Sequence, residues 1–214
     1  MFGFGKKKKE AAAQEAASAD VYVAPATGEY LPLSEVSDPV FSQGVMGDGY
    51  AVNPTAGTIV APVAGTIALI QDTLHAFMLR TDNGGEVLVH IGIDTVELGG
   101  EGFTKIANVG DKVEAGAPII EVDWAAIEGR IPSKETMVMI TNTAKFNISK
   151  DSEARRPVNA GDRVAQATKK QSRPLRWVKA SCSDRTKGRV LQAHTSLERG
   201  HFRYSRNFLT TPGC

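Results

Sequence analysis

Short apolar segments separated by Gly, Pro, Asp and Asn recur at intervals of about 8 to 12 residues from Val21 to Lys170, the spacing of strands and turns in an all-β sandwich or barrel. We therefore predict an all-β fold with at most short helices, of which Trp124 to Gly129 is the best candidate. Besides a central hairpin, the predicted strands are Val21–Ala24, Gly49–Val52, Thr58–Ala61, Gly65–Ile70, Pro118–Val122 and Met137–Thr141.

The predicted central hairpin carries one histidine on each arm. Its arms are His75–Arg80 and Glu86–Ile93. Between them lies Thr81–Gly85, whose Asp, Asn and Gly residues favour a tight reversal. These two histidines are the only ones among the first 170 residues.

The expected register of this hairpin brings the two histidines together. If Thr81 pairs with Glu86, His75 lies opposite Gly92, and His75 and His90 become diagonal neighbours on one face of the sheet. Diagonal neighbours have Cα atoms about 7–8 Å apart, so their side chains reach each other. The sequence therefore predicts a pair of converging imidazole rings.

Charge and composition together divide the chain into three parts. Residues 1–170 contain 16 Lys and Arg against 22 Asp and Glu, whereas residues 171–214 contain 9 against 2. We predict a flexible, Lys- and Ala-rich leader over residues 1–20, a folded β-sandwich domain over 21–170, and a basic tail over 171–214 that is disordered or non-native. Both cysteines lie in that tail, so the predicted domain has no thiol nucleophile and no disulfide.

The N-terminal region lacks the features of a secretory signal, because four lysines at positions 6–9 are followed by Glu and Ala and not by an apolar core. No apolar run approaches the roughly 18–20 residues that span a bilayer. We therefore expect a cytoplasmic protein. The two phenylalanines and four lysines of residues 1–9 suit either a weak contact with an anionic membrane surface or a solvated tail.

Three interpretations of the histidine pair are open at this point. The rings are hydrogen-bonded structural groups, or they are incidental zinc ligands, or one of them is a catalytic nucleophile. A complete zinc site needs three or four ligands, and Gly92 occupies the place where a His-x-His pair would supply another. As a nucleophile, one ring would carry a phosphoryl group while the other donates a hydrogen bond to its oxygens. Neutral histidine is available for this chemistry near pH 7.

Several motifs then resemble one family closely. They are the segments Gly47–Pro54, Val60–Thr66, His75–Phe77 and, above all, Val89–Phe103, and they resemble the glucose-type enzyme IIA of the bacterial phosphoenolpyruvate:sugar phosphotransferase system. The similarity runs from about Val21 to Lys170. It implies an antiparallel β-sandwich, with His90 as the phosphoryl acceptor and His75 as its partner. No cofactor and no metal are expected.

The remaining candidate site residues follow from their places beside the histidines. Thr73 precedes His75 by two residues, so its hydroxyl is placed to orient that ring. Asp94 either orients a ring or contacts a basic group of a partner, or it caps the turn at Thr95. The resemblance implies a loop beside the site at Asp38, with Val40 and Phe41 as an exposed apolar rim, although Phe41 suits a core role nearly as well. The predicted partner-binding residues are Asp38, Val40, Phe41, Ile91 and Val96.

The resemblance implies a phosphocarrier that takes phosphate from phospho-HPr onto histidine and passes it to the IIB domain of a membrane sugar permease. An alternative is a regulatory protein that binds target proteins through the same face according to its phosphorylation state. A third class, biotinyl or lipoyl carriers, needs a Lys in an Ala-Met-Lys hairpin tip, and this chain has Ser133–Met137 without that motif. We expect a monomer that does not bind nucleic acid.

Overall fold

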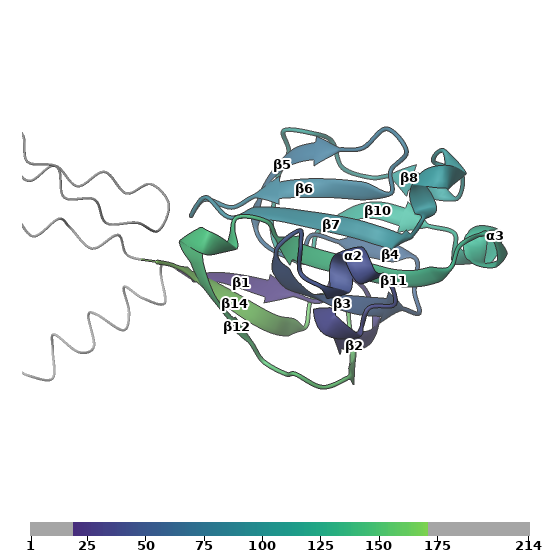
Figure 1. Ribbon diagram of the computed structural model, residues 1–214. Helices are drawn as coiled ribbons and strands as arrows, with labels where there is room; N and C mark the ends of the chain where they lie inside the picture. The colour runs from purple at the N-terminus through teal and green to yellow at the C-terminus, as the bar shows by residue number, and fades with distance from the viewer. Residues whose placement is uncertain (1–18, 171–214) are drawn as a thin grey trace, which may run out of the picture. The chain divides into compact units, whose positions relative to one another are not determined.

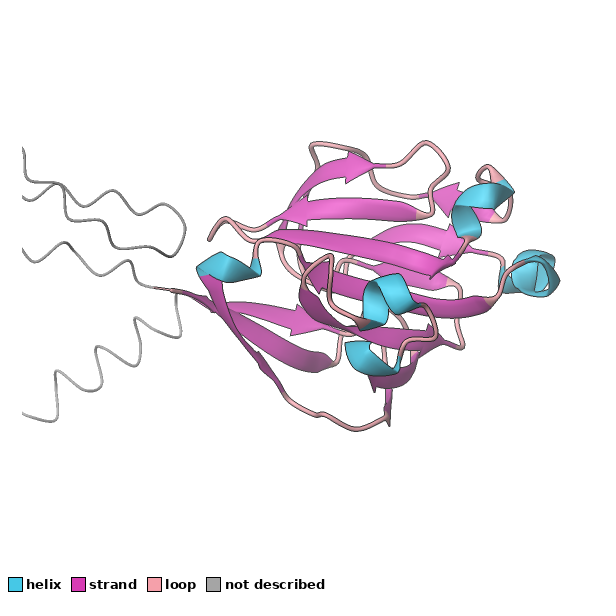
Figure 2. Cartoon of the chain, viewed as in Figure 1, coloured by secondary structure: helices cyan, strands magenta, loops and turns pink. Residues whose placement is uncertain are grey.

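A computed structural model describes residues 19–170. The predicted basic tail and all but the last two residues of the predicted leader lie outside the described residues. The described chain folds into antiparallel sheets with short helical turns (Figure 2), so the predicted all-β sandwich is confirmed, in its open and not its barrel form. No helix among residues 19–170 is long and apolar enough to cross a membrane.

The largest sheet has eight strands, and the two histidines belong to its centre. Its order is β13 (Arg156–Val158), β2 (Gly28–Pro32), β3 (Asp48–Pro54), β11 (Ser133–Ile140), β7 (Glu86–Ile93), β6 (Ala76–Arg80), β5 (Gly65–Ile70) and β9 (Lys112–Val113).

Two three-stranded sheets complete the sandwich. One has the order β1 (Ala19–Val23), β14 (Arg163–Lys169) and β12 (Phe146–Lys150), and the other β4 (Thr58–Val60), β10 (Pro118–Val122) and β8 (Phe103–Lys105). The helical turns are η1 (Leu33–Glu35), α2 (Pro39–Ser42), η2 (Thr95–Leu98), α3 (Trp124–Ile127), η3 (Glu128–Arg130) and η4 (Thr143–Lys145).

The main core joins one face of the eight-stranded sheet to the two smaller sheets. Alternation along β7 shows this directly, because Val87, Val89 and Ile91 are fully buried in that core while the residues between them face the other way. A period of two is what a strand with two differently covered faces requires. His90 therefore lies on the face of the large sheet that is turned away from the main core.

A second, smaller apolar cluster covers part of that other face, where α2 lies in front of strands β3 and β11 (Figure 1). The connection from β2 to β3, which includes η1 and α2, contributes Leu33, Val36 and Phe41, and these residues pack against Met137 and Met139 of β11. The cluster fixes α2 over the sheet close to His90.

The register of the central hairpin differs by one residue from the prediction. Arg80, and not Thr81, pairs with Glu86, so Ala76 lies opposite His90. Thr81 is held in the loop by its own bonds: its amide donates to the Gly85 carbonyl at 2.9 Å, and its Oγ1 accepts from the Gly85 amide at 2.9 Å. A shift of one residue reverses the face on which every side chain of a strand lies.

Strand β1 begins inside the segment predicted to be a free leader. Asp20 is only 9% exposed, and its carboxylate accepts hydrogen bonds from Thr81 Oγ1 at 2.7 Å and from Asn83 Nδ2 at 2.8 Å. These bonds satisfy a buried carboxylate that would otherwise destabilise the fold. Residues 19 and 20 thus belong to the sheet, because Asp20 ties β1 to the loop of the central hairpin.

Candidate functional site

His90 lies half-buried in the middle of the eight-stranded sheet. Its cross-strand neighbours are Ala76 on β6 and Met137 on β11, and the Phe41 ring of α2 lies 4.9 Å from its own ring, centroid to centroid. The paired strands β6 and β11 on both sides and the Phe41 ring together restrict the movement of the His90 ring. An imidazole placed in this way is held in one orientation before any partner arrives.

One hydrogen bond determines which nitrogen of neutral His90 carries the proton. Its Nδ1 lies 2.8 Å from the Gly92 carbonyl oxygen, which only accepts, so Nδ1 carries a proton. In the neutral ring the lone pair is then on Nε2. Gly92 has φ +73, and a Cβ at this residue would come within 2.5 Å of Thr95 Cγ2. Glycine at this position therefore allows the backbone to turn its carbonyl to the ring.

His75 reaches His90 by a break in the strand pattern. With the observed register, regular alternation would turn His75 toward the main core. Leu74 instead has φ +56, a left-handed conformation that is unusual for a residue with a side chain, and His75 lies just before β6 begins. The two imidazole rings meet edge to face, with centroids 5.2 Å apart and planes at 73°. The predicted convergence of the rings is confirmed, although the predicted register was wrong.

Thr73 orients the second ring as the sequence indicated. Its Oγ1 lies 2.5 Å from His75 Nδ1. When the hydroxyl donates this bond, the proton of neutral His75 is on Nε2, and that N–H is free to donate to a group bound between the rings. Thr73 is thus placed to set the tautomer and the direction of the His75 ring.

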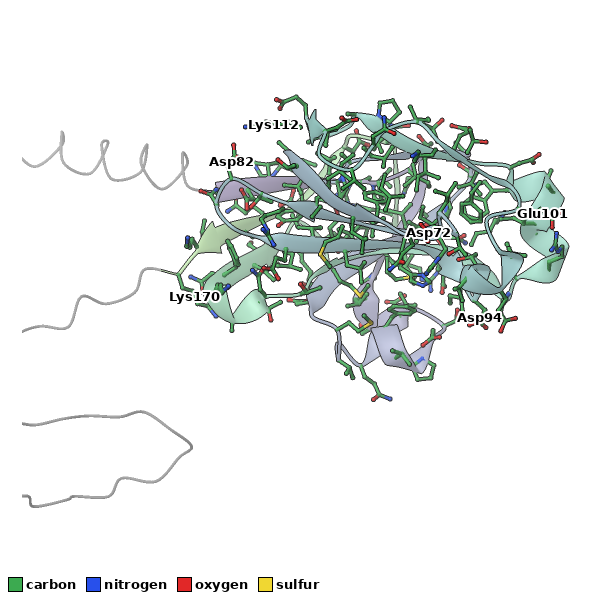
Figure 3. The ribbon with its side chains drawn as sticks, turned by 90° about the horizontal axis from the view of Figure 1, so that it is seen from above. Asp72, Asp82, Asp94, Glu101, Lys112 and Lys170 are labelled. Carbon is green, nitrogen blue, oxygen red and sulfur yellow. The ribbon has the colours of Figure 1, made fainter. Side chains whose placement is uncertain are left out.

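Asp38 and Asp94 are close enough to His90 for their charges to raise its pKa, in opposition to the burial that lowers it. Asp38 also caps α2, because its Oδ1 accepts from the Val40 amide at 2.6 Å. Asp94 has φ +57, makes no side-chain capping bond, and is exposed at the end of the domain opposite Asp82 and Lys170 (Figure 3). The capping role considered for Asp94 is therefore wrong, and its carboxylate is free to meet a basic group of a partner.

The predicted apolar rim is only partly exposed. Val40 is 54% exposed and Val96 is 49% exposed, as a docking surface requires. Phe41 is only 8% exposed because it packs in the second apolar cluster, so it is a wall of the site and not an exposed rim residue. Ile91 is fully buried in the main core, on the opposite face from His90, and the prediction that it contacts partners is wrong.

Two further exposed apolar residues follow α2 and escaped the sequence analysis. Val45 is 75% exposed and Met46 is 39% exposed. The signal that would have found them is their position between Gly44 and Gly47, both of which have positive φ angles in a short, exposed connection. Apolar side chains on such a connection are accessible to a partner protein.

Burial lowers the pKa of both imidazoles. For His90 the largest cause is desolvation, followed by the neighbouring His75, and the Gly92 bond and the two carboxylates oppose it only in part. For His75 the cause is desolvation. Both shifts favour the neutral ring at pH 7, which is the state in which an imidazole is a nucleophile. No group of three or more His, Cys, Asp or Glu side chains within residues 19–170 is arranged to hold a metal ion.

We expect His90 to titrate below pH 6.5, its ordinary value. NMR of the imidazole protons, recorded from pH 4.5 to 8, measures this midpoint. In the window between the lowered folded pKa and 6.5, the unfolded chain binds more protons than the folded one, so the free energy of unfolding should decrease as the pH falls through it. A midpoint above 6.5 would contradict the burial that the structure shows.

Comparison with known proteins confirms the family resemblance that the sequence motifs indicated. Residues 20–146 match the model of the family described as phosphoenolpyruvate-dependent sugar phosphotransferase system, EIIA 1. A protein of Staphylococcus aureus strain N315, named PTS system glucose-specific EIIA component, is 42% identical over 151 residues, which are 69% of this chain and 86% of that protein. The PTS system mannose-specific EIIBCA component of Corynebacterium glutamicum is 47% identical over 124 residues, 58% of this chain and 18% of that protein.

The solved structures agree with the sequences. The glucose permease IIA of Mycoplasma capricolum has a TM-score of 0.63 and 34% sequence identity, and the match covers 69% of this chain and 95% of that one. The fold, the motifs and the paired histidines thus lead to the same conclusion. The chain belongs to the EIIA 1 family of the phosphoenolpyruvate-dependent sugar phosphotransferase system and is a phosphotransferase component that carries phosphate in sugar transport.

Proposed function

We propose that His90 is the phosphoryl acceptor of this phosphocarrier and that the phosphate binds to Nε2. The observation that carries the proposal is the bond from Nδ1 to the Gly92 carbonyl, which leaves the lone pair on Nε2. In the first step Nε2 attacks the phosphorus of phospho-HPr, a new N–P bond forms in line, and the N–P bond to the HPr histidine breaks. Catalysis of such a transfer consists mainly of positioning and of charge stabilisation.

In this proposal His75 and Thr73 supply charge stabilisation, more for the onward transfer of the phosphate from His90 than for its acceptance. The Thr73 hydroxyl bonds to His75 Nδ1 at 2.5 Å, and the proton on His75 Nε2 is then donated to an oxygen of the transferring phosphoryl group. The rings are 5.2 Å apart, so a group on His90 lies within reach of His75. A preorganised donor of this kind acts where negative charge develops.

The second step passes the phosphate to a cysteine of the IIB domain of a membrane sugar permease, and we place it in the cytoplasm. The exposed Val40 and Val96 form the apolar contact with each partner, and Asp38 and Asp94 face its basic groups. Because each partner must leave within a turnover, we expect a small, transient interface and a monomeric carrier.

The test is reconstitution of the transfer. The full chain is incubated with labelled phosphoenolpyruvate, enzyme I and HPr, and the product is analysed for phosphate that is acid-labile and alkali-stable, as a phosphoramidate is. ³¹P NMR of the denatured product then separates Nε2 from Nδ1 phosphohistidine. Label that depends on HPr and resides on Nε2 supports the proposal. Absence of label, or label on Nδ1, would refute it.

Two neighbouring substitutions should separate docking from stability. Val40→Glu adds charge to a residue that is 54% exposed, so it should leave the free energy of unfolding within about 0.5 kcal/mol and slow exchange with HPr and IIB. Phe41→Glu places a charge in the second cluster, where Phe41 is 8% exposed, and should destabilise the domain by about 3 kcal/mol or more. Urea unfolding and transfer rates measure both. A stable Phe41→Glu protein would show that Phe41 is not a core residue.

A further inference from the structure

The connection from β2 to β3 brings Asp38 and Phe41 to His90, and a side chain of another strand holds this connection. Glu135 Oε2 accepts two hydrogen bonds from Ser37, one from its backbone amide at 2.9 Å and one from its Oγ at 2.6 Å. Ser37 immediately precedes Asp38, the residue that caps α2. We call this pair of bonds the Ser37–Glu135 clamp.

The clamp fixes the position of α2 relative to β11, the strand beside His90. Glu135 lies on β11 two residues before Met137, and Met137 is the cross-strand partner of His90. Strand β11 therefore both pairs with β7, which carries His90, and holds through Glu135 the backbone that leads into α2. A displacement of the connection relative to β11 is also a displacement relative to His90.

Helix α2 needs such support because it has only four residues, Pro39–Ser42. A single turn is not stable by itself, since nucleation of a helix costs more than one turn of hydrogen bonds returns. Burial of Phe41 secures the far end of the turn, and the Asp38 cap secures its start. The Asp38 carboxylate keeps its position at the start of α2 only if the backbone of the preceding residue, Ser37, is also held in place.

We infer that Glu135 is a positioning residue of the phosphoryl transfer, which through Ser37 sets the place of Asp38 and of the α2 docking surface relative to His90. The inference rests on the proposed function of this face. Glu135 does not contact His90, and its effect is transmitted by the clamp. Loss of the clamp should therefore weaken productive docking with phospho-HPr more than it slows transfer in the docked complex.

The clamp itself contributes little to the stability of the fold. Ser37 is exposed, so its amide and hydroxyl are hydrated when the carboxylate is removed, and no buried polar group is left without a partner. Phe41 remains buried in the second apolar cluster and keeps the connection attached. A Glu135 variant should therefore weaken docking with phospho-HPr while leaving the stability of the fold nearly unchanged.

The experiment compares the full-length protein with Glu135→Ala, Glu135→Gln and Glu128→Ala. Glutamine keeps a carbonyl oxygen that accepts both Ser37 bonds. Glu128→Ala is the matched control, because it removes an exposed carboxylate that pairs with Lys134 at 2.9 Å. Initial rates of labelling at varied phospho-HPr concentrations give the half-saturating concentration and the maximal rate, and thermal unfolding gives stability.

We expect Glu135→Ala to raise the half-saturating phospho-HPr concentration about five-fold, as the loss of two hydrogen bonds of modest net strength implies, and to change the maximal rate less than about two-fold. Glu135→Gln and Glu128→Ala should behave like the unmodified protein. Ser37→Ala, which retains the amide bond, should give an intermediate value and serves as the second variant if Glu135→Ala unfolds.

An unchanged half-saturating concentration in Glu135→Ala, or an equal increase in Glu128→Ala, would overturn the inference. So would a Glu135→Gln protein as impaired as the alanine variant, because the two Ser37 bonds would then not be the cause. These results are distinct from failure of the proposed function, in which the unmodified protein itself acquires no phosphate on His90.

Discussion

His90→Gln should abolish the incorporation of phosphate from phospho-HPr. The amide nitrogen of glutamine is not a nucleophile, whereas the side chain is polar, uncharged and similar in length to that of histidine, so it fills the place of the ring. We therefore expect a folded protein that no longer accepts the group. Labelling from phosphoenolpyruvate through enzyme I and HPr, followed by mass spectrometry of peptides, measures the effect.

The matched control for this experiment is His75→Gln, which changes the other imidazole of the pair. It should still be labelled, and the label should be on His90. Thermal unfolding of both variants should resemble that of the unmodified protein, because neither ring belongs to the main core. If His90→Gln is still labelled at HPr-dependent rates on another histidine, the assignment of the acceptor is wrong.

His75→Gln should retain acceptance of phosphate but slow its transfer to IIB. Glutamine replaces the ring that Thr73 holds by a flexible amide, so a donor of fixed direction is lost even though an N–H remains. Loss of one preorganised donor to developing negative charge typically costs about 2–4 kcal/mol, equivalent to roughly a 30- to 1,000-fold lower rate. Here the donor is His75 Nε2, directed by the contact of Nδ1 with Thr73 Oγ1 at 2.5 Å. Rapid-quench measurement of the disappearance of label from the phosphorylated variant, mixed with IIB, gives this rate.

Thr73→Val separates orientation from the presence of the ring. The variant keeps His75 and the shape of the threonine side chain but lacks the hydroxyl that bonds to Nδ1. We expect a transfer rate between those of the unmodified protein and His75→Gln. A wild-type transfer rate in His75→Gln would show that His75 does not stabilise the phosphoryl group.

The sequence by itself determined the fold class and indicated the histidine pair as the candidate site. Recurrent short apolar segments with Gly, Pro, Asp and Asn between them encode strands and turns locally, so β1, β3 to β7, β10, β11 and the short helix after Asp123 were predicted. The strands β2, β8, β9 and β12 to β14 were not predicted. Two histidines on the arms of one hairpin lie near each other along the sheet, and neither the hairpin nor the motifs around it needed knowledge of distant segments. Whether the two rings lie on the same face depends on the register.

Only the tertiary structure decided the finer geometry of the pair. The register depended on Thr81, which bonds within its own loop and also to Asp20 of a strand 61 residues away in sequence. The side on which His75 lies depended on the left-handed backbone of Leu74, which breaks the alternation that a sequence reading assumes. The shifted register and the left-handed backbone of Leu74 compensate each other, because each alone would turn His75 away from His90.

Burial of the surrounding apolar residues was likewise a tertiary property. The sequence shows that Phe41 and Ile91 are apolar but not which of the two cores each enters, because the second cluster joins the β2–β3 connection to strand β11, about 100 residues later. The Ser37–Glu135 clamp spans 98 residues for the same reason. Local pattern specifies strands and turns, whereas the packing of distant segments on the second face of the sheet specifies which side chains surround His90.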